Sequence, residues 1–317
     1  MRGTAAGFLV AGLLGMTATT ALAQDAAKAG AQATSNASAA TSPAAAATTT
    51  QPSADEPPSK RVTLTAGLDF VSAYMFRGLF QEDHGVIVPP FADVGVTAYS
   101  GDGALKAVTL NGGIWNSLHS GPSGSGNPDR NAWYEADYYG SVTFQVGNWK
   151  PGALFTSYTS PNDAFNMVNE LAGVLAYDDS GSAFPLNPKA ILAFELKGQA
   201  DGGGGLADGG SKGTYLELGV RPVVPVVAHS KYPLTLAIPA KIGLSLNDYY
   251  EGPTGSNKFG YFDLGGVLSV PLAFMNGKST WEVHGGVDVL WLGDNAKFLN
   301  GGDGVKPVAV VGFSVIY

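Results

Sequence analysis

Long runs in which apolar and polar residues alternate one by one constrain this chain more than any other feature. From Val62 to Phe76 most even-numbered positions are apolar, and the odd-numbered positions between them include Thr63 and Asp69. A period of two indicates a β-strand with one apolar face, because a helix would scatter these residues over both faces. The run is longer than the roughly 5–6 residues usual for soluble strands. It matches the roughly 9–11 residues of a tilted membrane strand.

The same alternation recurs along the rest of the chain and predicts about twelve strands. The predicted strands begin near Val62, Val86, Leu105, Trp133, Gly152, Phe165, Lys189, Thr214, Leu234, Phe259, Thr280 and Pro307. Short turns, such as residues 100–103, alternate with long polar loops, such as residues 117–131. An even strand number with alternating loop lengths is typical of outer-membrane barrels. The sequence therefore predicts an all-β fold, a closed antiparallel transmembrane β-barrel, rather than a soluble sandwich.

Composition agrees with this fold class and excludes several functions. Charged residues make up 14% of the chain, against about a quarter in soluble domains. No apolar run approaches the roughly 20 residues of a membrane helix. The chain has no Cys, which excludes thiolate metal sites, and its net charge is −8. Without a basic stripe to neutralise phosphates, nucleic acid is not expected as a partner.

Residues 1–23 have the pattern of a secretory signal peptide. Arg2 precedes an apolar stretch over residues 5–16, and residues 21–23 read Ala-Leu-Ala, a small-x-small cleavage site. Residues 24–60 are mostly Ala, Ser, Thr, Gln and Pro and have no periodic apolar face, so we expect a disordered periplasmic linker. The barrel is predicted to span residues 61–317.

The C-terminal residues resemble the terminal strand by which outer-membrane barrels are recognised for assembly. Tyr317 is an aromatic end residue, with Phe313, Val311 and Ala309 on its face. The pattern predicts the outer membrane of a Gram-negative cell as the location. It also predicts the barrel-assembly machinery and outer-membrane lipid as partners, and the oligomeric state is left open.

The mixed rows of the predicted strands should line the lumen. The opposite arrangement would place charges in hydrocarbon, at roughly 2–4 kcal/mol for each Lys or Arg at the midplane. The predicted lumen-lining residues are Asp69, Arg77, Asp93, Glu135, Asp137, Glu170, Lys189, Glu195, Lys197, Glu217, Arg221, Lys241, Asp263, Glu282, His284 and Asp288. Acidic groups outnumber basic ones, which favours cations. A barrel of about twelve strands leaves two possibilities open, a water-filled pore or a lumen plugged by side chains.

Few residues suggest catalysis. His119 lies close to Ser117 and Ser120, and a Ser–His pair is the core of barrel lipid hydrolases, but no Asn or Asp follows at a telling spacing. The glycine-rich residues 201–210 are predicted to be a surface loop. No catalytic, cofactor-binding or metal-binding residues are predicted, and no cofactor is expected.

One short motif resembles a known family. Tyr74, Phe76, Arg77 and Gly78 form a Tyr-x-Phe-Arg-Gly sequence, followed by Gln81 and, further on, by Pro89 and Asp93. This resembles the signature of TorF-like porins and covers the first predicted hairpin. The resemblance implies a small outer-membrane porin without catalytic residues. Arg77 is expected at the outer end of its strand, facing the lumen and paired with an acid such as Glu135 or Asp137.

Three functions follow from these observations. The leading hypothesis is an outer-membrane porin-like channel for passive diffusion of small hydrophilic solutes, with a preference for cations. The first alternative is a structural or adhesive barrel with a plugged lumen and functional external loops. The second is a barrel lipid hydrolase, although the chain is not expected to be an enzyme.

Overall fold

The computed structural model describes residues 61–121, 132–202, 210–228, 232–252, 255–272 and 279–317. The predicted signal peptide and linker lie outside these residues. No helix in the described part is both long and apolar enough to cross a membrane.

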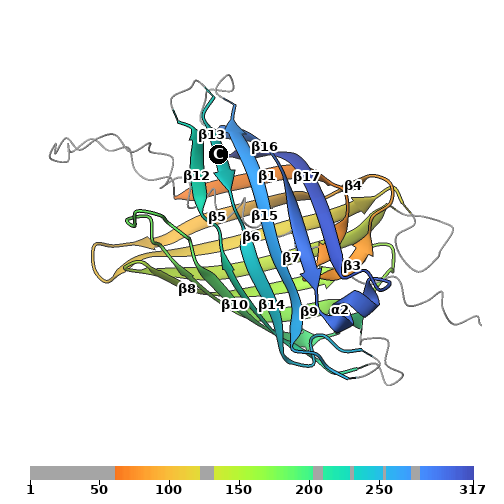
Figure 1. The fold of residues 1–317 in the computed structure, drawn as a ribbon. Coiled ribbons are helices and arrows are strands. Elements are labelled where there is room, and N and C mark those ends of the chain that lie inside the picture. Colours follow the sequence, from red (N-terminus) through yellow and green to blue (C-terminus); the bar gives the residue numbers. More distant parts are fainter. Residues whose placement is uncertain (1–60, 122–131, 203–209, 229–231, 253–254, 273–278) are drawn as a thin grey trace, which may run out of the picture.

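The described chain is almost entirely β-structure (Figure 1). The uninterrupted wall strands are β1 (Val62–Val71), β6 (Leu105–His119), β7 (Trp133–Val146), β8 (Trp149–Thr159), β9 (Val168–Tyr177), β10 (Lys189–Lys197), β15 (Phe259–Pro271), β16 (Thr280–Leu292) and β17 (Val305–Ile316). Three more are each built from two pieces, which are β4 (Ile87–Val88) with β5 (Pro90–Ser100), β11 (Thr214–Val220) with β12 (Val223–Val227), and β13 (Leu234–Ala237) with β14 (Ala240–Asn247). The remaining elements are β2 (Tyr74–Phe76), β3 (Leu79–Glu82) and the short helix α2 (Asp294–Leu299).

Strand pairing closes the wall into a ring. Neighbours pair antiparallel in the order β1, β5, β6, β7, β8, β9, β10, β11, β14, β15, β16 and β17, and β17 pairs back onto β1. At the closure Thr65 lies opposite Ile316 and Val71 lies opposite Val310. The structure therefore confirms the predicted closed antiparallel barrel of twelve strands.

Each of the three interrupted wall strands breaks beside a proline. Pro89 separates β4 from β5, Pro222 separates β11 from β12, and Pro239 separates β13 from β14. Proline has no N–H to donate to a strand ladder. The last two breaks lie opposite each other, because Val220 pairs with Ala240 on one side and Val223 pairs with Ala237 on the other.

The two faces of the wall differ in polarity. In β1 the even-numbered Leu64 and Phe70 are 43% and 47% exposed, while Asp69 between them is 0% exposed. In β17 Val311 and Phe313 are exposed, and Val310 is buried. The outer face is therefore apolar, and the buried polar residues point into the barrel.

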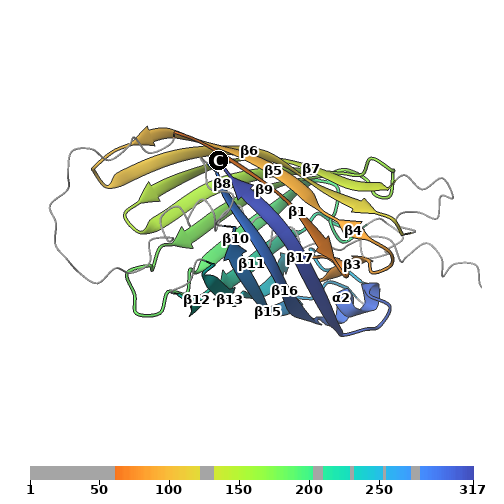
Figure 2. The same ribbon diagram turned by 90° about the horizontal axis from the view of Figure 1, so that it is seen from above.

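The two ends of the barrel also differ (Figure 2). At the terminal end, where β1 begins and β17 ends, the chain turns tightly between β7 and β8, with Gly147 at φ 57°. A two-residue hairpin of this kind favours positive φ. The opposite end, the loop end, carries α2 and β3.

Residues 74–82 form a small hairpin that does not continue the wall. Its strands β2 and β3 pair only with each other in the described structure, and Tyr74, Met75 and Leu79 are all 0% exposed. We call these residues the inner hairpin, because they fill the barrel near the loop end and form its buried apolar core with side chains of the wall. The predicted first strand is therefore too long, since the wall strand ends at Val71.

Candidate functional site

The tip of the inner hairpin is a two-residue turn. Phe76 pairs with Leu79, and between them Arg77 has φ 50° and Gly78 has φ 81°. Two successive positive φ values are the mark of a type I′ turn, which favours glycine. Gly78 is also packed tightly, because a Cβ at this position would lie 2.8 Å from the Cβ of Tyr261 on β15. The turn and the close approach to the wall thus both require glycine at position 78.

This geometry makes Gly78→Ala a test of the tip. We expect it to cost about 2–4 kcal/mol of unfolding free energy, from the left-handed conformation and from overpacking against Tyr261. Urea unfolding of the barrel in lipid vesicles measures the change. Gly103→Ala is the matched control, since nothing lies within 4 Å of its Cβ position. Equal stability of the two variants would contradict a packed tip.

Arg77 anchors the tip to the far side of the barrel. Its Nη1 and Nη2 donate to Oε2 and Oε1 of Glu170 on β9, at 2.6 and 2.8 Å. Nη1 also lies 2.6 Å from Oη of Tyr249, and the guanidinium stacks 4.1 Å from the ring centroid of Tyr215. Bidentate pairing and aromatic stacking are the interactions that distinguish Arg from Lys.

Tyr residues from the loop before β15 complete this anchor. Tyr250 donates its hydroxyl to the backbone oxygen of Arg77 at 2.8 Å. Burial raises the pKa of Tyr249 well above its ordinary value, although Arg77 opposes the shift. The Tyr249 hydroxyl therefore stays protonated at physiological pH and accepts a hydrogen bond from Arg77 without adding a charge.

The partner of Arg77 differs from the expected one. Glu135 and Asp137 were the expected acids, but Glu170 forms the ion pair, and Glu135 instead accepts a hydrogen bond from Tyr74. In the ring of twelve strands, β9 is the fifth strand after β1, so it lies almost diametrically opposite β1. Arg77 reaches it because the hairpin folds inward, whereas an arginine at the end of a wall strand would stay near its own neighbours.

The base of the inner hairpin packs against aromatic side chains on β6 and β7. Tyr74 stacks on Trp115 with centroids 5.6 Å apart, and His119 stacks on Tyr134 at 4.5 Å. The Tyr134 hydroxyl also donates to Gln81 of β3. Tyr134 has the same parity as Tyr138, which is exposed on the outer face, but a register shift between Ser117 and Leu118 in the β6–β7 pairing turns Tyr134 inward.

The Ser–His pair noted in the sequence does form. Ser117 Oγ lies 2.7 Å from His119 Nε2 on the inner face of β6. The other ring nitrogen, Nδ1, has no hydrogen-bond partner among the described residues, so no acid orients the ring as in a catalytic triad. Ser117 is 0% exposed, and the rings of Tyr74 and Tyr134 contact His119.

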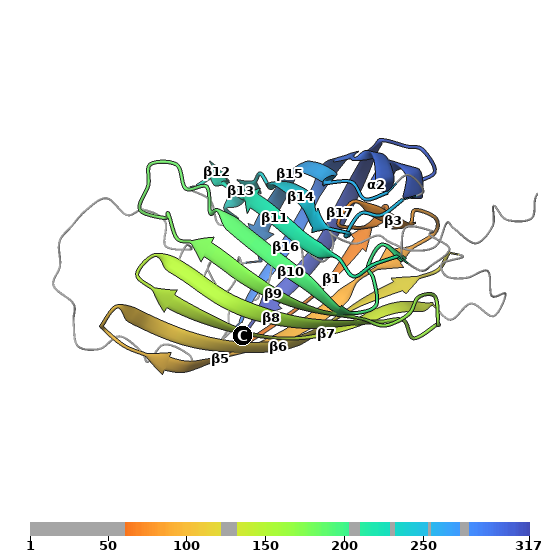
Figure 3. The same ribbon diagram turned by 90° about the horizontal axis from the view of Figure 1, so that it is seen from below.

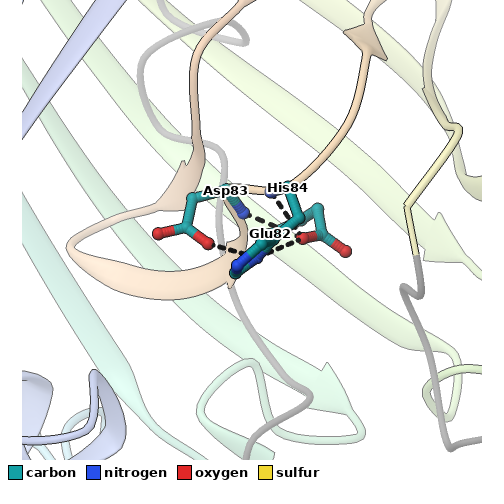
Figure 4. Close-up of side chains that lie close together, drawn as sticks. All are labelled: Glu82, Asp83 and His84. Carbon is teal, nitrogen blue, oxygen red and sulfur yellow. Dashed lines mark hydrogen bonds and ion pairs between the residues drawn. The ribbon is translucent and has the colours of Figure 1, made fainter.

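Charged residues directly after the inner hairpin connect it to β17 through an ion pair. Lys306 Nζ lies 2.6 Å from Oδ2 of Asp83, and His84 Nδ1 lies 2.6 Å from the other oxygen, Oδ1. Glu82 accepts the backbone N–H groups of Asp83 and His84 (Figure 4). The side chains of Glu82, Asp83 and His84 are close enough to one another to bind a metal ion together. Lys306 already pairs with Asp83 Oδ2, and two backbone N–H groups donate to Glu82 Oε1, so the arrangement is explained as a turn fixed by ionic and hydrogen bonds.

Other segments pack beside the inner hairpin at the loop end, where α2 lies next to β3 (Figure 3). Asn295 of α2 donates to the backbone oxygens of Tyr250 and Gly255, at 2.8 and 2.7 Å. Glu251 donates its backbone N–H to Asp201 and accepts that of Ser211. The barrel end is thus packed with hydrogen-bonded loops as well as the hairpin.

Most of the predicted lumen residues lie on the inner face. Those that are buried in the wall are Asp69, Asp93, Glu135, Asp137, Glu170, Glu195, Glu217, Lys241, Asp263 and Asp288. Lys189, Arg221, Glu282 and His284 are half-buried. Arg77 is inside the barrel but on the inner hairpin instead of the wall. Whether these residues line an open pore stays a prediction.

Several of these residues neutralise each other across strands. His284 Nε2 lies 2.8 Å from Oδ1 of Asp69, and Lys241 Nζ lies 3.5 Å from Oδ2 of Asp263. Asp93 accepts a hydrogen bond from Asn111 at 2.9 Å. The inner wall beyond the hairpin is therefore polar and partly charge-paired.

Lys197 is the exception, and its predicted place in the lumen is wrong. The pairing of β10 with β9 shifts register between Glu195, which lies opposite Glu170, and Lys197, which lies opposite Asn169. Successive residues of a strand point to opposite faces, so this bulge places Lys197 on the outer face, where it is exposed.

The sequence pattern missed the tyrosines that surround Arg77. Tyr215, Tyr249, Tyr250 and Tyr261 are all 0–1% exposed, and Tyr215 and Tyr261 share the carboxylate of Glu217 at 2.7 and 3.0 Å. The adjacent pair Tyr249-Tyr250 in a polar loop was the one available signal, because a loop in solvent rarely needs two neighbouring aromatics.

Comparison with known proteins identifies no family. No family model and no curated protein matches the chain, so the resemblance to TorF-like porins stays a prediction. Among solved structures, the NanC porin matches with 13% identity over 80% of this chain and 98% of its own, at a TM-score of 0.39. The translocator domain of the autotransporter NalP from Neisseria meningitidis matches with 13% identity over 93% of this chain and 97% of its own, at a TM-score of 0.36. These scores are too low to carry an argument, and the fold rests on the strand pairing.

Proposed function

We propose that this protein is a porin-like channel of the outer membrane whose lumen is closed at the loop end by the inner hairpin. Small hydrophilic solutes pass by passive diffusion when the inner hairpin moves out of the lumen. One observation carries the proposal, namely a closed barrel with an apolar outer face and a charged inner wall.

The outer face supports a membrane location. Its exposed residues are largely apolar, and exposed Trp133, Trp149 and Trp291 lie near strand ends, as in the aromatic girdles of membrane barrels. The loop end carries the longer connections and is proposed to face the outside. The terminal strand β17 presents Val311 and Phe313 outward, and Tyr317 directly after it is exposed, which supports recognition by the barrel-assembly machinery.

The inner wall supports passage of cations. With Lys197 on the outer face, the remaining predicted lumen residues comprise ten carboxylates and five basic side chains, which are Arg77, Lys189, Arg221, Lys241 and His284. Rings of acidic side chains favour cations over anions. The inner hairpin supports a closed resting state, because its tip is fixed to β9 and its base to β6 and β7.

Single-channel recording of the refolded mature protein, residues 24–317, in a planar bilayer tests the proposal. We expect infrequent openings that give discrete current steps. Under a KCl gradient the reversal potential should have the sign of cation preference. A reversal potential of the opposite sign would contradict the role of the acidic wall.

The inner hairpin also favours a second candidate, a permanently plugged structural barrel. Its buried contacts resemble a protein core more than a loose constriction. This candidate predicts that the wild type passes no current, because the hairpin stays in the lumen. Both candidates treat Ser117 and His119 as structural residues, because the pair is buried.

A further inference from the structure

Three exposed lysines lie at the loop end of one side of the barrel. Lys197 ends β10, Lys212 precedes β11 by two residues, and Lys258 immediately precedes β15. We call these residues the lysine rim. The strands β10, β11, β14 and β15 are neighbours in the wall. A spacing of about 4.8 Å between strands spreads the rim over roughly 14 Å.

The local structure turns Lys197 away from the lumen. Without the bulge after Glu195, Lys197 would share the inner face with Glu195. Bulges re-aim side chains at barrel rims and are features of a fold rather than defects. The bulge therefore moves one positive charge from the acidic lumen to the outer surface.

The rim lysines have no carboxylate partner among the described residues. Lys212 Nζ donates to the backbone oxygen of Leu196 at 2.7 Å, next to Lys197 in the chain. Lys197 Nζ contacts Sδ of Met167 at 3.7 Å. Neither of these two ammonium groups forms an ion pair among the described residues, and Lys212 is bonded to the backbone of the residue next to Lys197.

Two of the nearby acids, Glu195 and Glu251, are buried and already bonded to backbone amides. Glu195 accepts the N–H groups of Gly213 and Ala200, at 2.6 and 2.5 Å. Glu251 accepts that of Ser211 at 2.6 Å, and both carboxylates are buried. The half-buried Asp248 directly after β14 accepts a hydrogen bond from Asn247 and offsets one of the three rim charges, so the described part of the rim stays positive on a chain with net charge −8.

An apolar wall adjoins the lysine rim on the side toward the barrel middle. Exposed Leu171, Phe194, Leu196 and Phe259 lie on its outer face. Further along, a shallow apolar groove is lined by residues of β8 to β11, including the small residues Gly173 and Ala190. A positive band above an apolar surface is complementary to a molecule with an anionic head and hydrocarbon tails.

We propose that the lysine rim binds the phosphate groups of a phosphorylated glycolipid in the outer leaflet, whose acyl chains lie against the adjoining wall. The proposal rests on the proposed function, which places the loop end outside. A soluble anionic partner would not need the apolar surface below the charges.

Lipid titration of the folded mature protein in detergent tests the lysine rim. The variant is Lys197→Gln/Lys212→Gln/Lys258→Gln, and the probe is diphosphoryl lipid A counted by native mass spectrometry. The matched control is Arg61→Gln/Lys106→Gln/Lys297→Gln, which removes the same charge from exposed positions elsewhere. We expect the rim variant to bind at least about tenfold more weakly than the wild type and the control. Removal of the lipid phosphates should abolish the difference, and added salt should reduce it.

Two outcomes would overturn the lipid site. Equal affinity of the rim variant and the control would show that the lysines do not bind the head group. Displacement of the lipid by millimolar inorganic phosphate would show a site for a free anion.

Orientation is tested separately, because the chain has no Cys. A Ser256→Cys variant carries a single thiol at an exposed position of the loop end. Labelling by an impermeant maleimide in intact cells is expected. Labelling only after permeabilisation would overturn the orientation in the proposed function, whereas a labelled protein without the lipid difference would overturn the rim alone.

Discussion

Replacing residues 73–85 with a short Gly-Ser turn should convert a barrel that opens rarely into one that conducts steadily. The ends of the removed segment are close, because Val71 and Ile87 are paired neighbours, so a short turn can join them. Side chains of the inner hairpin fill much of the barrel interior at the loop end. A twelve-stranded ring is wider than the roughly eight strands that side chains alone can fill. Single-channel conductance and solute entry into liposomes measure the change, and heat-modifiable migration shows that the barrel has folded.

A reversible lock provides the control for this deletion. A Cβ at Gly78 would lie 2.8 Å from the Cβ of Tyr261, closer than the roughly 3.5–4.5 Å of a disulfide, so the oxidised pair requires a small outward shift of the hairpin tip. The Gly78→Cys/Tyr261→Cys protein should pass no current when oxidised and should open when reduced. A deleted hairpin that leaves the barrel silent would contradict the channel.

Arg77→Met should release the hairpin tip without removing it. The substitution leaves Glu170 buried at 2% exposure without its ion-pair partner. Loss of one member of a buried pair costs about 3–5 kcal/mol. If that cost falls on the closed state, the open probability should rise by about 100-fold or more. The fraction of time spent open in bilayer recordings measures the change.

The double variant Arg77→Met/Glu170→Met separates the ion pair from general damage. Removing both charges avoids the unpaired carboxylate, so the double variant should be closed more of the time than Arg77→Met alone. Arg77→Lys should fall between the wild type and Arg77→Met, because lysine keeps the charge but loses the bidentate geometry. An Arg77→Met barrel as closed as the wild type would contradict the anchoring role.

The wall of the barrel could be predicted from the sequence because its signal is repeated. Strands at Leu105, Trp133, Lys189 and Thr280 begin where the alternation predicts them. The apolar outer rows in β1 and β17 follow the same parity as predicted. Each strand of a membrane barrel faces the same two environments, so the same local pattern holds all the way around.

The inner hairpin could not be predicted in this way. Tyr74 and Phe76 continue the even-numbered apolar row of β1, yet they are buried inside the barrel. An apolar residue that faces lipid and one that faces a core are identical in a period-two pattern. The Arg77-Gly78 pair was the local sign of a turn, and only the three-dimensional structure shows where that turn points.

Bulges set the second limit on prediction from sequence. Lys197 and Tyr134 each lie beside a register shift, and each faces the side opposite to the one its parity predicts. Both shifts occur near the loop end, where the wall meets packed loops. A single inserted residue reverses the face of every later residue in its strand, and nothing in the alternation marks where that occurs.

The facing proline breaks in β11–β12 and β13–β14 have a consequence for assembly. Beyond them β12 pairs only with β13 among the described strands, so one of its edges is not covered by a neighbour. An uncovered edge is a template on which a strand from another molecule can add. Pro225 interrupts the amide row of this five-residue strand, and Pro222 stands directly before it. Pro222 and Pro225 therefore shorten and interrupt this uncovered edge, which should limit edge-to-edge strand pairing between molecules.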